Sequence, residues 1–205
     1  GFGGRTLLKD KNIPKYVNSP ESDIYQKSKV LYGINHAKSS MIGEDNCYLV
    51  EGYTDVISLH QAGIENVVAS SGTSLTKDQI RLINRYTKNI TILYDGDEAG
   101  VKASFRGIDM ILEQGMDVKI VLFPGGEDPD SYARSHRTSE VKDFITKQAR
   151  NFIFFKTNLL LKEAQDDPIK KAGLIKEIVG SIALIPDQIT RNIYVKECAT
   201  RMEMS

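Results

Sequence analysis

Six acidic side chains follow apolar runs that have the length of buried strands. Glu51 and Asp55 follow residues 47–50, Asp95 and Asp97 follow residues 90–94, and Asp128 and Asp130 follow residues 118–123. Because loops at the carboxyl ends of parallel strands open into one crevice, we expect these carboxylates to converge. Clustered carboxylates raise one another's pKa values and favour a cation, and oxygen ligands together with substrate phosphates suit Mg²⁺. The spacing therefore predicts a divalent-metal site that handles phosphate groups.

Each motif also has a simpler interpretation when it is taken alone. Glu51 and Asp55 could be acids that stabilise the first turn of a helix. Asp128 could belong to a turn that caps a helix starting near Asp130. The D-G-D sequence at 95–97 directly follows an apolar run and resembles a metal-binding loop more than a helix cap. Their common order, each after an expected strand, favours the metal site.

Apolar periodicity predicts the elements that would position these acids. A further strand is expected at 67–69, and helices are expected at 23–37, 54–62, 76–86 and 98–114. Gly63 and Gly115 follow two of these helices, and Thr76 has capping-box spacing to Gln79. From residue 139 onward no strand signal remains, and apolar stripes predict three helices, the last two opened by Pro168 and Pro186.

This order of elements predicts an α/β fold with a mainly parallel sheet flanked by helices on both faces. We expect a basic N-terminal segment over residues 1–43, a catalytic domain over 44–138 and a C-terminal helical bundle over 139–205.

The composition is that of a globular chain with unevenly placed charge. The 205 residues have a net charge of zero, yet residues 1–40 hold seven Lys and Arg residues against three Asp and Glu residues, a local charge of +4. Such a basic segment beside acidic loops suits a polyphosphate or a nucleic-acid backbone, although it could also be an ordinary solvated surface. No apolar run approaches the roughly 20 residues that span a bilayer, and no secretory leader is recognisable, so a cytoplasmic protein is expected.

Other chemistries find little support in the sequence. It contains no P-loop and no G-x-S-x-G motif. His36, His60 and His136 are isolated, and the two cysteines, Cys47 and Cys198, lack the spacing of zinc ligands.

Taken together, the motifs resemble those of a known family. The sequences EGYTDV at 51–56, DGD at 95–97 and EDPD at 127–130 are similar to the signatures of the TOPRIM domain. GFGGR at 1–5 and KYVNSPE at 15–21 resemble more specifically the bacterial DnaG-type DNA primases. The resemblance covers essentially the whole chain. It implies a TOPRIM-type sheet and the core of an RNA polymerase that makes short RNA primers on single-stranded DNA for replication.

The resemblance also implies a role for each candidate residue. Catalysis would involve Glu51, Asp55, Asp95 and Asp97. Two or more Mg²⁺ or Mn²⁺ ions would be held by Glu51, Asp95, Asp97, Asp128 and Asp130. Nucleotide phosphates and nucleic acid would be held by Arg5, Lys15, Asn18 and Lys27, with Tyr16 beside them. Physically, this set suits two-metal nucleotidyl transfer.

The same resemblance sets expectations for partners. We expect single-stranded DNA, ribonucleoside triphosphates and an RNA primer as partners of a monomeric chain. The family's zinc-binding domain, the first part of its polymerase core and its helicase-contacting C-terminal domain are expected to lie outside this chain. We therefore expect no zinc, and we expect metal and nucleotide binding with poor initiation of primers.

Two other classes remain open. A TOPRIM nuclease or topoisomerase would cut the backbone with the same acids. A non-catalytic module would grip single-stranded nucleic acid through the basic segment and would need no metal.

Overall fold

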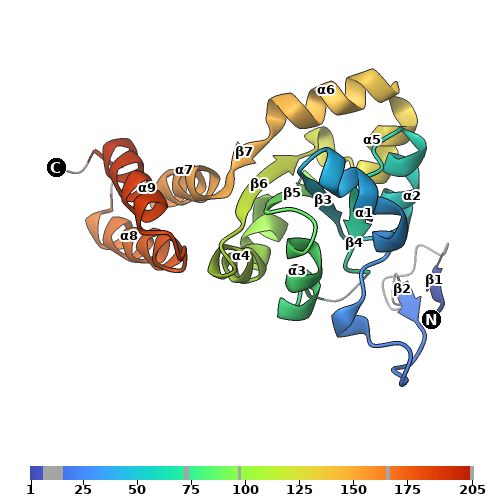
Figure 1. Ribbon diagram of the computed structural model, residues 1–205. Helices are drawn as coiled ribbons and strands as arrows, with labels where there is room; N and C mark the ends of the chain where they lie inside the picture. Colours follow the sequence, from blue (N-terminus) through green and yellow to red (C-terminus); the bar gives the residue numbers. More distant parts are fainter. Residues whose placement is uncertain (7–15, 72–73, 97, 165–166, 204–205) are drawn as a thin grey trace.

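The computed structural model describes residues 1–6, 16–71, 74–96, 98–164 and 167–203, and within these ranges a five-stranded sheet forms the centre of the chain (Figure 1). The strands lie in the order β4-β3-β5-β6-β7; the first four run parallel, whereas β7 is antiparallel to β6. Their bounds are Cys47–Val50 for β3, Val67–Ala69 for β4, Asn89–Tyr94 for β5, Asp117–Leu122 for β6 and Arg150–Asn151 for β7. The predicted α/β fold is confirmed.

Helices cover both faces because successive strand residues point to opposite sides of the sheet. One face packs against α1, α3 and α4, for example through Leu49 and Ile92, and the other packs against α2, α5 and α6, for example through Val50 and Leu93. The helices are α1 Ile34–Gly43, α2 Tyr53–Gln61, α3 Lys77–Asn84, α4 Glu98–Glu113, α5 Pro129–Ser135 and α6 Thr138–Gln148. Each face therefore has its own apolar core, and the acidic loops lie at the edge between them.

Local signals correctly placed most of these elements. Thr76 caps α3, since its hydroxyl accepts a hydrogen bond from Gln79 N and its own N–H donates to the Gln79 side chain. Gly63 and Gly115 follow α2 and α4 with positive φ angles of 72° and 67°, which glycine adopts at low cost. The strand β7 was missed because its two residues are too few to show a periodic pattern.

The helix predicted over residues 23–37 is wrong in its first part. A short 3₁₀ turn, η1 Lys27–Lys29, is followed by an extended segment, and α1 begins only at Ile34. Tyr32 pairs with Ala69 through two backbone hydrogen bonds of 2.9 and 3.1 Å, which a helical residue could not form at the edge of a sheet. Gly33 then turns the chain with a left-handed φ of 83°.

An antiparallel hairpin precedes this segment. Its strands are β1 Gly3–Arg5 and β2 Tyr16–Asn18, and Arg5 lies opposite Tyr16 in the register. No alternation of apolar and polar residues predicts these strands, since each has only three residues.

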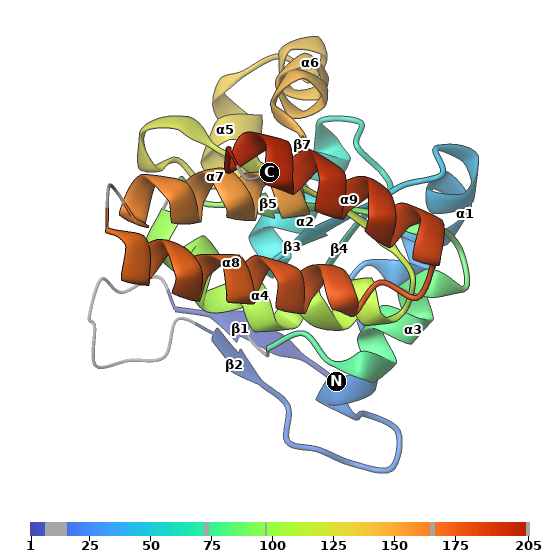
Figure 2. The same ribbon diagram turned by 90° about the vertical axis from the view of Figure 1, so that its left-hand side faces the viewer.

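Three helices end the chain, as predicted: α7 Phe152–Ala164, α8 Pro168–Ala183 and α9 Gln188–Arg201. Asp167 and Asp187 cap α8 and α9 by accepting hydrogen bonds from backbone N–H groups of the first turn. Figure 1 shows α8 and α9 at the end of the molecule away from α2 and the hairpin, with α7 between them and the sheet, and Figure 2 faces this end. The expected boundaries after residues 43 and 138 stay predictions.

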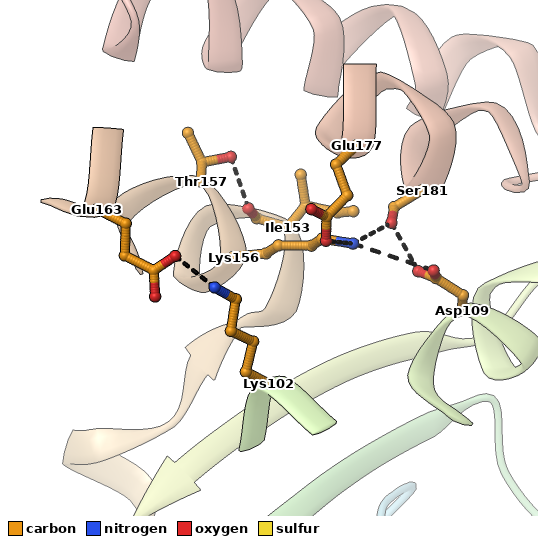
Figure 3. A network of polar contacts seen from close by, with 8 residues as sticks. All are labelled: Lys102, Asp109, Ile153, Lys156, Thr157, Glu163, Glu177 and Ser181. Atoms are coloured by element: carbon orange, nitrogen blue, oxygen red, sulfur yellow. Dashed lines mark hydrogen bonds and ion pairs between the residues drawn. The ribbon is translucent and has the colours of Figure 1, made fainter. Parts of the chain in front are cut away.

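A buried polar network joins this bundle to the sheet domain (Figure 3). Lys156 on α7 is 2% exposed, and its Nζ lies 2.9 Å from Ser181 Oγ and 3.1 Å from Glu177 Oε1, both on α8. Asp109 on α4 accepts a 2.6 Å hydrogen bond from Ser181 and lies 4.0 Å from Lys156. The Lys156 network, which consists of Lys156, Asp109, Glu177 and Ser181, therefore fixes α7 and α8 against α4. Among the described residues, none of the helices has the length and apolarity needed to cross a membrane.

Candidate active site

The acids predicted from the sequence come from loops at one edge of the sheet. Glu51 follows β3 and Asp95 follows β5, two neighbouring strands, and both residues are exposed. Asp128 and Asp130 follow β6, the next strand in the sheet, and open α5. Asp97 and the Gly72-Thr73 motif lie outside the described residues.

The pKa of Asp55 shows that charges on these loops influence one another. It lies in the first turn of α2, is 8% exposed, and accepts a 2.9 Å hydrogen bond from Gly52 N through Oδ2. Burial raises the pKa of Asp55 to about 6; the Gly52 hydrogen bond opposes this shift, and the charges of Asp128, Asp95 and Asp130 add to it. The structure thus brings acids from three loops into one electrostatic environment, as the strand order predicts. We call Glu51, Asp55, Asp95, Asp128 and Asp130 the acidic site.

The charge of Glu51 acts on the neighbouring strand, β5. Burial raises the pKa of Tyr94, the last residue of β5, to about 12; a hydrogen bond with Ser104 lowers it, and the charge of Glu51 raises it. The Glu51 carboxylate therefore acts across the boundary between β3 and β5.

The two acids of α5 differ in their contacts. Asp128 is the N-cap, and its Oδ1 accepts a 2.7 Å hydrogen bond from Ser131 N. Asp130 is 6% exposed; its Oδ1 accepts a hydrogen bond from Ser58 Oγ on α2, and its Oδ2 lies 3.6 Å from Arg134. The simpler interpretation of Asp128 as a helix cap is confirmed. No local sequence pattern predicts a role for Ser58, because its contact with Asp130 joins two helices that are far apart in the chain.

Glycine allows the acidic loops to approach closely. A Cβ atom on Gly96, between Asp95 and Asp97, would lie 2.2 Å from the backbone oxygen of Phe123 at the end of β6. Gly125 and Gly126 continue the second loop with φ angles of 66° and 77°. The D-G-D motif thus needs its glycine so that the loop after β5 can pack on the end of β6.

The predicted nucleotide-binding residues lie on the hairpin and on η1. Asn18 is in contact with the loop after β4, since its Nδ2 donates a 2.9 Å hydrogen bond to Ser71 O. Lys27 is half-buried and lines a cavity of about 800 Å³ together with Tyr25, Tyr32 and Tyr53. The backbone places Arg5 and Tyr16 opposite each other on the hairpin, and Lys15 lies outside the described residues.

The acidic site offers the ligands that a hard divalent cation requires, because every member is a carboxylate oxygen donor. In the described ranges, no three Asp, Glu, His or Cys side chains are grouped closely enough to hold an ion by themselves. Mg²⁺ is usually bound by one or two carboxylates together with waters and substrate phosphates. The described acids therefore fit an ion whose coordination is completed by the substrate.

The fold and the position of the acids define a Toprim-like domain, and residues 48–133 match the family model described as Toprim-like. Residues 1–38 match the model for the N-terminal domain of the DNA primase catalytic core, and residues 155–205 match the model for the DnaB-helicase binding domain of primase. The chain belongs to the family of bacterial DnaG-type DNA primases.

Individual relatives agree with this assignment. A DNA primase of Clostridium acetobutylicum is 41% identical over 205 residues, which are 98% of this chain and 33% of that protein. A DNA primase domain from Pseudomonas aeruginosa has a TM-score of 0.86 at 34% identity, covering 99% of this chain and 64% of that one. A DnaG primase catalytic domain solved with single-stranded DNA has a TM-score of 0.86 at 34% identity, covering 100% and 65%. The chain spans about a third of the length of the curated relatives.

One expectation has to be corrected. The helicase-contacting part was expected to lie outside this chain, but most of α7 and all of α8 and α9 fall within the match to the DnaB-helicase binding domain of primase. The sequence could not show this, because the apolar stripes of these helices are equally typical of any helical bundle.

Proposed function

We propose that this chain is the catalytic part of a DNA primase, which joins ribonucleotides into short RNA primers on single-stranded DNA during replication in the cytoplasm. One observation carries the proposal: the buried Asp55 carboxylate lies in the combined field of Asp95, Asp128 and Asp130. This arrangement occurs in a chain that aligns over its whole length with solved primase catalytic domains. Such a field favours bound cations and the phosphates that accompany them.

The residues of the acidic site would have different roles in catalysis. Glu51, Asp95, Asp97, Asp128 and Asp130 would hold two or more Mg²⁺ or Mn²⁺ ions. When bound, these ions would activate the primer 3′-hydroxyl and neutralise the triphosphate and its pyrophosphate leaving group. Asp55 would orient the loop that carries Glu51 through its hydrogen bond to Gly52.

The basic N-terminal segment would hold the other reactants. Arg5, Lys15, Tyr16 and Lys27 would bind the nucleotide triphosphate and the template backbone, with Asn18 contributing through its place on the hairpin. Single-stranded DNA as the template is supported by the neighbour solved with it. The match over 155–205 supports a contact between α7–α9 and the replicative helicase.

Primer extension tests this function directly. An end-labelled RNA primer annealed to single-stranded DNA is incubated with the chain, ribonucleotides and Mn²⁺, and the products are separated on a gel. We expect products longer than the primer, and we expect Asp95→Ala to reduce their yield by at least about a hundredfold, because a ligand to the metal is lost. Asp143→Ala, an exposed acid on α6 in an ion pair with Lys147, is the matched control and should not change the yield.

The gel also separates the rival classes. Shortened labelled strands would indicate a nuclease. An unchanged primer, together with DNA binding that persists in EDTA, would indicate a non-catalytic binding module. Both outcomes contradict the proposal.

A further inference from the structure

A chain of hydrogen bonds ties the N-terminal hairpin to the loops of the acidic site. Tyr53, the first residue of α2, donates from its hydroxyl to Asn18 Oδ1 on β2, and Asn18 Nδ2 donates to Ser71 O at 2.9 Å. Because a backbone carbonyl can only accept, the Asn18 amide must present its oxygen to Tyr53. The Tyr53 hydroxyl is therefore the donor, and this fixes the direction of both hydrogen bonds in the series.

Packing around the Tyr53 ring reinforces this connection. A Cβ atom on Gly3 of β1 would lie 2.5 Å from atoms of the ring, so the hairpin backbone lies directly against it. The Tyr32 ring meets the Tyr53 ring edge-on, with centroids 4.7 Å apart and planes at 66°. Tyr53 is thus held between the hairpin and the segment that precedes α1.

The same connection reaches the acidic site through the backbone. Tyr53 stands between Glu51 and Asp55 in the sequence. Ser71, whose oxygen accepts from Asn18, donates its own N–H to Glu51 O at 3.1 Å and has a left-handed φ of 62°. The loops after β3 and β4 and the hairpin are therefore joined at one point beside Glu51.

We propose that Tyr53 is a positioning residue, whose hydroxyl holds the basic hairpin beside the acidic site so that a nucleoside triphosphate can contact both. This inference rests on the proposed function for its substrate. The ring alone could pack against Gly3 and Tyr32. The hydroxyl is needed only to orient Asn18 and, through it, the hairpin relative to Ser71. The contacts that carry this role join Tyr53 to Asn18, Gly3 and Tyr32, so its hydroxyl should affect nucleotide binding rather than metal binding.

Tyr53→Phe tests the hydroxyl alone, because it preserves the ring and its packing. Three quantities are measured on the purified chain: Mn²⁺ affinity by calorimetry, affinity for a fluorescent ribonucleoside triphosphate in the presence of Mn²⁺, and hydrogen exchange of the hairpin. We expect nucleotide affinity to fall about five- to tenfold, the effect of one lost hydrogen bond that leaves Asn18 Oδ1 without the Tyr53 donor. We expect Mn²⁺ affinity to stay within about twofold and exchange in β1 and β2 to become faster, while exchange in β5 is unchanged.

Two further variants sharpen the test. Tyr32→Phe makes the same chemical change on the neighbouring ring and should leave nucleotide affinity and hairpin exchange unaltered. Gly3→Ala changes the same contact on the hairpin. Its methyl group would crowd the Tyr53 ring and should therefore also weaken nucleotide binding.

The outcomes separate this inference from the proposed function. Unchanged hairpin exchange in Tyr53→Phe would overturn the positioning role, whatever the chain binds. Faster exchange with unchanged nucleotide affinity would overturn its link to the substrate. If the unaltered chain binds no nucleotide, the proposed function fails and the link to the substrate fails with it, while the exchange data still decide whether Tyr53 holds the hairpin.

Discussion

The acidic site and the Lys156 network both remove charged groups from water, but they balance that charge differently. In the acidic site, Asp55 is 8% exposed, and burial together with three neighbouring aspartates raises its pKa to about 6. In the Lys156 network, a 2% exposed ammonium group lies 3.1 Å from one carboxylate and 4.0 Å from another (Figure 3).

This difference distinguishes a cluster that stabilises the fold from one that is suited to a ligand. The Lys156 network contains its own cation, which lies beside both carboxylates in the folded chain. The acidic site accumulates like charges, which costs the folded state free energy until a cation from solution is bound. Removing the cation from the first cluster should therefore destabilise the chain, whereas removing a carboxylate from the second should stabilise it.

The largest effect is expected for Lys156→Ala. The substitution leaves the carboxylates of Asp109 and Glu177 without their shared cation and removes the contact of Nζ with the Phe105 ring, at 4.8 Å. We expect the free energy of unfolding to fall by about 3 kcal/mol in urea denaturation. Lys176→Ala, an exposed lysine of α8, is the control and should change it by less than about 0.5 kcal/mol. Equal effects of the two variants would show that the network does not stabilise the fold.

Asp55→Asn should have an intermediate effect of the opposite sign. The folded pKa of about 6 lies above the reference value of 3.8, so ionisation of Asp55 disfavours the folded state, and the penalty grows as pH rises from about 4 to 6. In EDTA at pH 8, the variant should be more stable by about 2 kcal/mol, and the difference should vanish below pH 4. Asparagine keeps an acceptor for Gly52 N, so the loop is preserved.

Urea denaturation at several pH values, with and without Mn²⁺, measures this effect. The ion should remove much of the difference at pH 8, because it neutralises the field around Asp55. A variant that is less stable than the unaltered chain at every pH would contradict the inference that burial and like charges in the acidic site disfavour the ionised Asp55.

The smallest changes in stability are expected for alanine substitutions of two buried serines. Ser58 donates to Asp130 in the acidic site, and Ser181 donates to Asp109 in the Lys156 network. Each Ser→Ala variant should lose at least about 1 kcal/mol of stability, because a hydrogen bond to a carboxylate is lost, and Ser181→Ala also removes the acceptor of the Lys156 hydrogen bond. Only Ser58→Ala should also weaken Mn²⁺ binding, by about tenfold, since Asp130 loses the partner that orients it. Calorimetry with Mn²⁺ distinguishes the two, and equal metal affinities would place Asp130 outside the metal site.

Much of the fold follows from local signals. The strands at 47–50 and 67–69 are short apolar runs, and the caps at Thr76, Asp167 and Asp187 depend on side chains that reach backbone groups within a few residues. The helix predicted over residues 23–37 is wrong before Ile34 for the opposite reason. Its residues have helical spacing, but Tyr32 pairs with Ala69 at the edge of the sheet, a contact that no local pattern records.

The sequence by itself predicted which edge of the sheet carries the acids, because the position of each acid after a strand depends on neighbouring residues and on the common direction of parallel strands. The tertiary structure decided how the acids and their supports interact. Packing buries Asp55. It also joins residues that lie far apart in the sequence, as in the hydrogen bonds from Ser58 to Asp130 and from Tyr53 to Asn18. Such contacts arise when whole elements pack, and the free energy of that packing is distributed over both cores rather than encoded in any one motif.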